Sequence, residues 1–299
     1  MTGFSADWLA LREPFDLAAR AEAAATMDLR GMASRMRGDG RPLDVLDLAC
    51  GTGANLRALA PRLGGAQRWL LVDHDPRLLA ALPGVFAAWS HAQGFALRAV
   101  AEGLHIEGPD WRAELRWRCA DLASGLDALP FADAQLVSAA ALLDLVSMPW
   151  LEALFAHVRK AGAAMFFALS VDGRMRWSPA AEEDDAIHRL FEAHQRRDKG
   201  FGPALGGDAP ASAAALLAGA GYGVTQACSD WQIEEVEMLR ALIDGMATAA
   251  LEQAPAAQAR VEAWRAHRMA AAPGTRLQVG HVDFLAEPGQ SLLAKSRFF

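Results

Sequence analysis

The chain has 299 residues, of which 53% are hydrophobic and 22% are charged, a composition that excludes a disordered protein and favours a folded globular one. Its formal net charge of −7, from 29 Lys and Arg against 36 Asp and Glu, offers no basic surface of the kind that nucleic-acid backbones require. The three cysteines are widely separated and indicate neither a disulfide framework nor a zinc site, so we expect no metal. The N-terminal residues lack the pattern of a secretory signal, and the apolar runs are shorter than the roughly 20 residues of a membrane helix, so we expect a cytoplasmic protein.

The first 39 residues are expected to form an N-terminal helical arm. The segment 16–36 is rich in alanine, with scattered Leu, Met and Arg, and favours a helix. Pro14 and the Gly38-Asp39-Gly40 cluster are expected to bound this helix, because proline and glycine interrupt helical patterns. Residues 40–299 would then form the main domain.

Strand-like runs follow one another through the main domain, most of them separated by helical stretches. They cover residues 43–48, 69–72, 115–119, 135–139, 163–170, 222–227 and 277–285. Asp75 is expected to cap a helix that begins at Pro76. The alternation of strands and helices indicates an α/β fold with an open, mostly parallel sheet.

The most informative segment is the glycine turn between the first of these strands and the helix after it. Gly51 and Gly53 let a ligand lie against the backbone, and Asp73, at the end of the next strand, is placed to reach ribose hydroxyls. The third glycine of the dinucleotide fingerprint G-x-G-x-x-G would fall at Leu56 and is absent, so no tight helix start for a pyrophosphate is expected. The turn therefore favours a nucleoside without phosphates, although the glycines could also serve the turn alone.

Two runs, Asp47-Leu48-Ala49-Cys50-Gly51-Thr52-Gly53 and Val72-Asp73-His74-Asp75, resemble those of the class I S-adenosylmethionine-dependent methyltransferases. The resemblance covers about residues 40–230, and the run 281–286 looks like the last strand of that family. It implies a Rossmann-like, seven-stranded sheet that is mostly parallel, with an antiparallel last strand and helices on both faces. It also implies S-adenosyl-L-methionine as the cofactor and S-adenosyl-L-homocysteine as the product.

The same resemblance assigns cofactor contacts residue by residue. The glycine loop would receive the methionine part of the cofactor, through Asp47, Ala49, Cys50, Gly51 and Gly53. Asp73 would hold the ribose, and His74 would lie beside the adenine. Asp121 would meet the adenine amino group, or else cap a helix, with Leu122 packed nearby. The residues that would border the cofactor after the fourth strand are Ser138 and Ala139.

Four segments go beyond a minimal member of this family, namely the arm and insertions at about 88–114, 171–208 and 232–273. The arm could fold over the cofactor, where Arg12 or Arg20 would pair with the cofactor carboxylate; the alternative is that both arginines are solvated. The insertion at 88–114 is expected to be a helix followed by a turn at Gly108-Pro109-Asp110. The last insertion shows helical apolar spacing from Val236 to Met246, which favours a helix that acts as a lid or a dimer face.

The insertion at 171–208 is expected to bind the substrate, because sites on α/β sheets form in the loops beyond the carboxyl ends of the strands. Ser178 is expected to cap a helix that begins at Pro179, and His194 would end the inward-facing stripe of this helix. His194 is then either a core histidine or a group that binds or deprotonates the substrate nucleophile. The candidate substrate-positioning residues are Arg174, Gln195, Asp198 and Lys199, with a solvated Asp198–Lys199 charge pair as the alternative.

Three further side chains are expected near the cleft. Asp144 lies in an apolar run, so it is either a buried structural acceptor or a base that faces the substrate. Trp177 and Trp231 could form an aromatic wall for a flat or cationic substrate, or could belong to the core. The catalytic candidates are therefore His194 and Asp144.

Together these features predict a methyltransferase that moves the methyl group of S-adenosylmethionine in line to an oxygen or nitrogen of a small molecule. Alignment of the reacting atoms can supply much of the rate enhancement, so few catalytic residues are required. One alternative keeps the cofactor and changes the acceptor to RNA or protein, and another is a non-catalytic nucleoside-binding subunit with the same fold. We expect a monomer or a homodimer, without a nucleic-acid or membrane partner.

Overall fold

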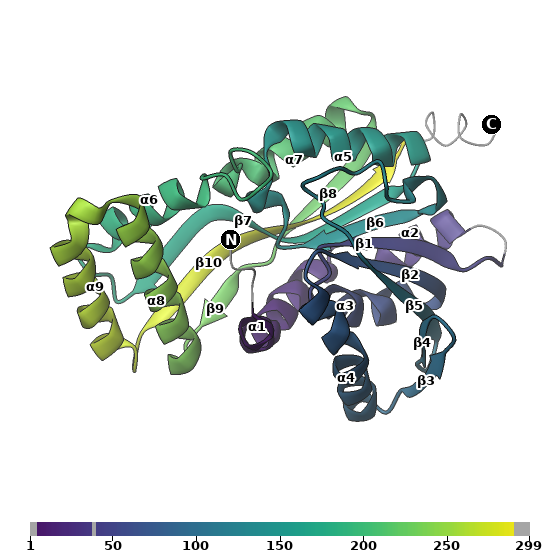
Figure 1. Ribbon diagram of the computed structural model, residues 1–299, viewed down its shortest axis with the longest axis horizontal. Coiled ribbons are helices and arrows are strands. Elements are labelled where there is room, and N and C mark those ends of the chain that lie inside the picture. Colours follow the sequence, from purple (N-terminus) through teal and green to yellow (C-terminus); the bar gives the residue numbers. More distant parts are fainter. Residues whose placement is uncertain (1–4, 38–39, 290–299) are drawn as a thin grey trace.

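The computed structural model describes residues 5–37 and 40–289, which are arranged around one mixed sheet (Figure 1). The strands in this part of the chain are β1 (Leu43–Leu48), β2 (Gly65–Asp73), β3 (Ala96–Val100), β4 (Gly103–Glu107), β5 (Trp111–Cys119), β6 (Leu136–Ala140), β7 (Ala164–Ser178), β8 (Tyr222–Cys228), β9 (Trp231–Ile233) and β10 (Arg276–Pro288). They lie in the order β3-β4-β5-β2-β1-β6-β7-β10-β8, and β9 pairs with β10. Parallel pairs join β5, β2, β1, β6 and β7, whereas β10 runs antiparallel to both β7 and β8.

The predicted Rossmann-like sheet is confirmed in the series β5-β2-β1-β6-β7-β10-β8, in which the last strand along the chain is the antiparallel one. Each of the seven predicted strand runs falls within one of these strands, apart from single residues at two of their ends. The expected count of seven is too low, because β3, β4 and β9 enlarge the described sheet to ten strands. In β1, neighbouring residues Val45 and Leu46 are both buried, so both faces of the sheet are covered.

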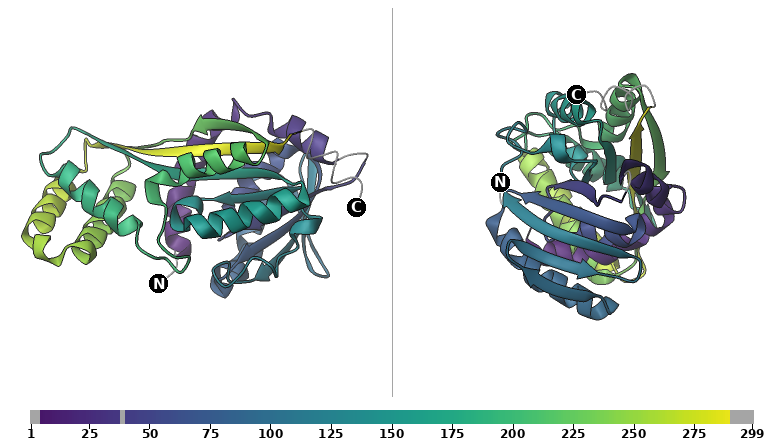
Figure 2. Two further views of the ribbon diagram at one scale, coloured as in Figure 1. Left: turned by 90° about the horizontal axis from the view of Figure 1, so that it is seen from above. Right: turned by 90° about the vertical axis from the view of Figure 1, so that its right-hand side faces the viewer.

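Helices form a layer on each side of the sheet (Figures 1 and 2). One layer contains α1 (Ala6–Ala24), α2 (Leu29–Arg37), α3 (Ala54–Leu63) and α4 (Pro76–Gln93), and the other contains α5 (Met148–Ala161) and α7 (Ala209–Gly219). Short 3₁₀ turns are η1 (Phe131–Asp133), η2 (Leu143–Leu145), η3 (Gly206–Asp208) and η4 (Pro255–Ala257). Among the described residues, no helix combines the length and the apolarity needed to span a membrane.

The insertion at 88–114 differs from the expected helix and turn, because α4 ends at Gln93 and the chain then forms the β3–β4 hairpin. Gly94 ends the helix in a left-handed conformation, with φ of 69°. Beyond it, Phe95 packs edge-on against Trp89 and Trp111, with ring centroids 5.2 Å away in both pairs. A Cβ at Gly103 would lie 1.8 Å from the Leu115 carbonyl oxygen, so glycine is what allows β4 to approach β5. The predicted turn at Gly108-Pro109-Asp110 does lie between β4 and β5.

The N-terminal arm contains two helices, and Pro14 does not bound the first of them as predicted. Helix α1 begins at Ala6, where the Ser5 side chain accepts a hydrogen bond from the Trp8 N–H (3.1 Å), and it continues past Pro14. A proline within a helix removes one backbone hydrogen bond. Packing of the buried side chains on either side of Pro14 compensates for this loss and overrides the local preference. The Gly38-Asp39 part of the predicted boundary lies outside the described residues.

A helical lobe extends from one end of the sheet and occupies the left of Figure 1. It consists of α6 (Asp184–Gln195), α8 (Val236–Gln253) and α9 (Gln258–Ala271). The paired strands β7 and β10 run beyond their neighbours and carry these helices (Figure 2). The insertions at 171–208 and 232–273, which are distant in sequence, therefore come together in one lobe.

The centre of the lobe is an ion pair between Asp184 of α6 and Arg268 of α9, whose side chains are 10% and 1% exposed. Asp184 also accepts hydrogen bonds from the Trp264 indole N–H (2.9 Å) and from the Ala181 N–H (2.7 Å). The helix predicted to begin at Pro179 begins at Asp184 instead, because Ser178 is still paired with Arg276 as the last residue of β7.

Replacing Asp184 by Ala should lower the free energy of unfolding by about 3–5 kcal/mol, because Arg268 would remain buried without its carboxylate. Chemical denaturation at pH 7 measures this loss. The matched control, Asp208→Ala, removes an exposed pair with Arg196 and should cost less than about 1 kcal/mol. Equal losses in the two variants would contradict a central role for the buried pair.

Candidate active site

The loop from Ala49 to Gly53 joins β1 to α3 and has left-handed backbone at three positions. The φ angle is 52° at Ala49, 54° at Gly51 and 79° at Gly53. A Cβ at Gly53 would lie 2.6 Å from the Phe86 ring, so glycine is required there. Inside the loop, the Cys50 N–H donates to the Val72 carbonyl (2.9 Å) and the Gly53 N–H donates to the Cys50 carbonyl (2.8 Å). The predicted turn is therefore present, with a fixed shape, at the carboxyl end of β1.

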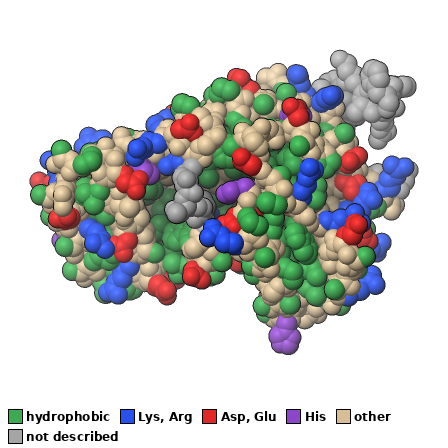
Figure 3. Space-filling model, viewed as in Figure 1, with side chains coloured by type: hydrophobic (Ala, Val, Ile, Leu, Met, Phe, Trp, Pro, Cys, Tyr) green, Lys and Arg blue, Asp and Glu red, His purple; other side chains and the backbone are tan. Residues whose placement is uncertain are grey.

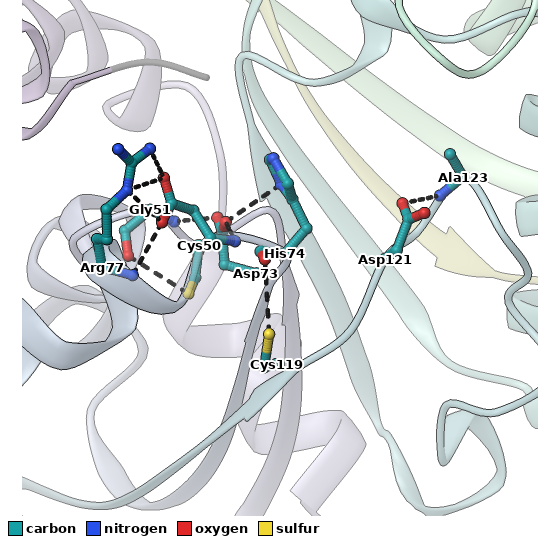
Figure 4. Close-up of polar contacts among 9 residues, drawn as sticks. Cys50, Gly51, Asp73, His74, Arg77, Cys119, Asp121 and Ala123 are labelled. Carbon is teal, nitrogen blue, oxygen red and sulfur yellow. Dashed lines mark hydrogen bonds and ion pairs between the residues drawn. The ribbon is translucent and has the colours of Figure 1, made fainter. Parts of the chain in front are cut away.

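Asp73 ends β2 and ties this loop to the neighbouring strand (Figure 4). Its Oδ2 accepts a hydrogen bond from the Gly51 N–H (2.8 Å), and its Oδ1 accepts one from the Asp75 N–H (2.9 Å). The exposed ring of His74 places Nδ1 3.4 Å from the same Oδ1. A carboxylate has about four acceptor positions, so Asp73 retains capacity for ribose hydroxyls beside the loop. Asp75 caps α4 as predicted, since it accepts from the Arg77 N–H (2.8 Å).

Asp121 lies in the turn that follows β5. The Cys119 thiol at the end of β5 donates to the His74 carbonyl at 3.5 Å, so the two strand ends are adjacent (Figure 4). Asp121 is exposed and accepts from the Ala123 N–H (2.9 Å), while the carbonyl of buried Leu122 accepts from the Trp150 indole N–H (2.8 Å). Asp121 thus stabilises a turn rather than a helix, and its contact with adenine remains a prediction.

A buried polar network lies beneath the glycine loop, centred on Asp47 of β1. Its Oδ1 accepts hydrogen bonds from the Ser138 hydroxyl (2.6 Å) and from the Asn55 amide (2.5 Å). Asp47 is 0% exposed, and its Oδ2 has no partner among the described residues. Burial raises the pKa of Asp47 to about 6, although these hydrogen bonds oppose the rise. Next to Ser138 on β6, the predicted cofactor neighbour Ala139 is buried and pairs with Leu48.

Asn55 was not anticipated from the sequence. Its amide oxygen accepts a hydrogen bond from Arg20 Nη2 (2.8 Å), which connects the N-terminal arm to Asp47. The available signal was a polar residue in the first turn of a helix that is otherwise mostly apolar. Cys50, within the same loop, is buried, and burial raises the pKa of its thiol.

Helix α1 lies over the glycine loop, as the sequence predicted for the arm. A Cβ at Gly51 would lie 3.1 Å from the Leu9 side chain. Glu13 forms two hydrogen bonds with Arg57 of α3 (2.8 and 2.6 Å), and Arg57 also donates to the Thr52 carbonyl in the loop (2.6 Å). The arm is therefore fixed to the loop and shields it.

The two arginines proposed for the cofactor carboxylate have different surroundings. Arg12 donates two hydrogen bonds to Asp16 (3.0 and 3.1 Å), and its guanidinium lies 5.0 Å from the ring centroid of Trp231. Arg20 is 2% exposed, its guanidinium lies 5.6 Å from the Phe166 ring centroid, and its Nε has no partner among the residues that the structure describes. Burial lowers the pKa of Arg20, as expected for a cation without a bound carboxylate. Arg20 therefore has donor capacity left, whereas Arg12 is already paired.

A second group of buried polar side chains lies further along the same face of α1, next to β9 and β10. The Trp231 indole N–H donates to Asp16 (3.0 Å), and its ring lies 4.8 Å from that of His281. His281 Nδ1 lies 3.0 Å from the Val279 carbonyl, so this nitrogen carries the proton and donates it, and burial lowers the pKa of His281 to about 3. His281 was expected only as part of the last strand, because its environment depends on contacts with α1 and β9 that no local pattern reveals.

Asp144 lies in η2, just beyond the carboxyl end of β6. It is 7% exposed, and its Oδ1 has no hydrogen-bond partner in the described structure. Burial raises the pKa of Asp144 to about 6, and the nearby charge of Arg12 opposes this rise without a hydrogen bond between the two side chains. Asp144 is thus buried with one oxygen unpaired among the described residues, and its role as a base that faces the substrate remains a prediction.

Several predicted substrate residues are engaged in other contacts. Arg174 binds Asp172 (2.6 Å) and Asp230 (2.8 and 3.0 Å), and so connects β7 to the turn before β9. Asp198 accepts hydrogen bonds from the Gly200 and Gly202 N–H groups (2.7 and 2.9 Å), which shapes its loop. These contacts are structural, and the roles of both residues toward a substrate remain predictions.

The remaining candidates lie on or beside the helical lobe. His194 Nε2 is 2.9 Å from Glu252 of α8, so His194 joins two helices of the lobe. Lys199 Nζ donates to the His194 carbonyl (3.3 Å), and burial lowers its pKa. Gln195 ends α6 and is half-buried. Trp177 packs against Trp264 and beneath Arg268, whereas Trp231 packs against α1, so the two tryptophans have separate contacts and no shared wall is seen.

The carboxyl edge of the sheet offers hydrogen-bond acceptors and one buried cation to a ligand. Asp47, Asp73 and Asp144 supply carboxylates, and Arg20 supplies a buried guanidinium. Within residues 5–37 and 40–289, no group of three or more His, Cys, Asp or Glu side chains is arranged to hold a metal ion. The site is therefore suited to a ligand that carries ammonium, carboxylate and hydroxyl groups.

Comparison with family models and with curated proteins finds no match. Among solved structures, a cyclopropane-fatty-acyl-phospholipid synthase-like protein from Lactobacillus casei is 16% identical, with a TM-score of 0.53 over 95% of this chain and 94% of that chain. The plantazolicin methyltransferase BpumL in complex with SAH is 10% identical, with a TM-score of 0.42 over 95% and 91% of the two chains. An S-adenosylmethionine dependent methyltransferase from Mesorhizobium loti is 16% identical, with a TM-score of 0.35 over 93% and 98%.

The first of these likenesses extends over nearly the whole of both chains. The protein therefore shares the fold of that structure, and the predicted Rossmann-like α/β fold is confirmed. At 16% identity the likeness concerns the fold alone.

The stability of the ligand-free protein should depend on pH through Asp47. Because its folded pKa of about 6 exceeds the ordinary value of 3.8, the folded state binds the proton more tightly, and stability falls as pH rises from about 4 to 6. The Asp47→Asn variant does not titrate there. Between pH 4 and 7.5, the wild type should therefore lose up to about 3 kcal/mol relative to the variant in denaturant unfolding. A difference that stays constant over this range would contradict the assigned environment.

Proposed function

We propose that the protein is a methyltransferase that uses S-adenosylmethionine to methylate an oxygen or nitrogen of a small molecule. The observation that carries the proposal is the pair of unsatisfied buried groups beneath the glycine loop. Within the described part of the chain, Asp47 Oδ2 lacks a donor and Arg20 Nε lacks an acceptor, although buried polar atoms are nearly always paired. The fold supports the same conclusion.

The residues present fit the cofactor. Its α-ammonium group would supply donors to Asp47, and its α-carboxylate would supply an acceptor to Arg20. Asp73, next to Gly51, would accept hydrogen bonds from the ribose hydroxyls. His74, Asp121 and Leu122 at the adjacent strand ends would surround the adenine.

When bound, S-adenosylmethionine supplies a methyl group on a positively charged sulfur. The chain's own contribution is to hold the reacting atoms in line, which can account for much of the rate enhancement. Asp47 and Arg20 would fix one end of the cofactor and Asp73 the middle. Helix α1, held by the Glu13–Arg57 pair, would exclude water from the loop.

A small acceptor is favoured by the closed surroundings of the site. Leu9 and Glu13 of α1 cover the loop, and Arg12, Asp16 and Arg20 of the same helix are buried. The net charge of −7 favours neither RNA nor a phosphate-rich partner.

Titration calorimetry with S-adenosylhomocysteine should give micromolar binding to the wild type and at least tenfold weaker binding to Asp73→Ala, because the ribose would lose its acceptor. The matched control is Asp110→Ala. Asp110 directly precedes β5, at the opposite edge of the sheet, so this variant should bind S-adenosylhomocysteine like the wild type. No binding to a well-folded wild type would refute the proposed cofactor.

The role of Arg20 can be tested with two nucleosides that differ only in the amino-acid part. Arg20→Gln should bind S-adenosylhomocysteine about tenfold or more weakly, because the carboxylate loses a charged partner. Its affinity for 5′-methylthioadenosine, which has no carboxylate, should change less than about twofold. Equal losses for both ligands would indicate that Arg20 only supports the fold.

A further inference from the structure

We propose that Asp144 binds the acceptor as a protonated amine, so that the substrate is a small primary or secondary amine received between η2 and α1. This inference rests on the proposed function and names the substrate class of the same site. Its basis is a buried carboxylate that has no cation of its own, next to an arginine that is already paired.

Asp144 is a buried carboxylate that forms no ion pair with another described side chain. Its side chain is more than nine-tenths buried, its Oδ1 has no donor, and it follows β6 at the edge of the sheet where the glycine loop lies. A buried carboxylate without a partner is costly, so a ligand that supplies a donor and a positive charge is strongly favoured.

The charged groups around Asp144 do not already neutralise it. Against the effect of burial, the charge of Arg12 lowers the pKa of Asp144, but Arg12 donates two hydrogen bonds to Asp16 and lies over the ring of Trp231. Asp16 offsets the charge of Arg12, and His281 on β10 is neutral because its Nδ1 proton is held by the Val279 carbonyl and burial lowers its pKa. The remaining charge at this position is that of Asp144 itself.

Figure 3 shows a hollow between the helical lobe and the rest of the molecule, with hydrophobic side chains on its walls. We take this hollow as the place of the amine. Trp8 lies one helical turn before Arg12 on α1, and its buried indole N–H has no partner among the described residues, so it would offer one donor to an uncharged oxygen or nitrogen of the same ligand.

The chemistry at Asp144 is a single proton transfer. The ammonium N–H bond breaks, the O–H bond of the Asp144 carboxyl forms, and the positive and negative charges cancel. The amine nitrogen then keeps the electron pair that a nucleophile requires. Because the pKa of Asp144 is raised to about 6 by burial, its carboxylate is a stronger base than an ordinary exposed one.

The test is calorimetry at pH 7.5 in the presence of saturating S-adenosylhomocysteine. The probes are benzylamine, phenethylamine and tryptamine, each paired with the alcohol of the same skeleton. At least one amine should bind the wild type, with its alcohol about tenfold weaker. Asp144→Asn should lower the amine affinity about tenfold or more and leave that for S-adenosylhomocysteine within about twofold. Asp127→Asn, whose side chain is 97% exposed, is the matched control and should bind like the wild type.

A second measurement compares the pH dependence of amine binding in the wild type and in Asp144→Asn. The amine affinity should fall several-fold from pH 7.5 to 5, as Asp144 gains a proton, and this dependence should vanish in Asp144→Asn. A dependence that persists in the variant would assign the titration to Asp16, whose pKa is also raised by burial, and would overturn the proposal.

Equal binding of amine and alcohol, an unchanged affinity in Asp144→Asn, or binding of S-adenosylhomocysteine with none of the amines would also overturn it. These outcomes leave the proposed function intact. Failure of S-adenosylhomocysteine to bind would instead refute the proposed function itself.

Discussion

The structure depends on how it buries negative charge at the carboxyl edge of its sheet. Asp16, Asp47, Asp144 and Asp283 are all at least nine-tenths buried there, and burial raises the pKa of each carboxyl group. The buried cations that oppose this effect on one or more of them, Arg12 and Arg20, both come from α1. Helix α1 therefore contributes electrostatically as well as sterically, because its two arginines offset part of the buried negative charge. The excess of negative groups also explains why cationic ligands suit this edge.

Local chemistry made the central part of the fold predictable. The glycine loop, the Asp75 cap and the strand at 43–48 depend on residues close in sequence, and each was found where expected. The continuation of α1 through Pro14 and the β3–β4 hairpin were not, because the first depends on packing and the second on the close approach of β4 to β5 at Gly103. At both segments, tertiary contacts therefore outweighed the local preference that proline and composition indicate.

The site shows the same division. Asp47, Asp73 and the covering arm could be found from motifs and their order along the chain, whereas the Asp16–Trp231 contact joins residues 215 positions apart. Asp144 was a candidate because a carboxylate in an apolar run is unusual, but only the structure shows that one of its oxygens is unpaired. His194, which followed a helical pattern, contacts Glu252 in the lobe, and Trp177 packs against Trp264 there, while the roles of both residues toward a substrate remain predictions.

The position of α1 has a kinetic consequence. Leu9, Arg12, Glu13 and Asp16 are spaced i, i+3, i+4 and i+7 and so share one face of the helix. This single face contacts the glycine loop, through Leu9 and Arg57, and also Trp231. If the proposed cofactor and acceptor bind at these two places, a displacement of α1 that releases one of them would also disturb the contacts of the other, and the mobility of this one helix would set the order of release.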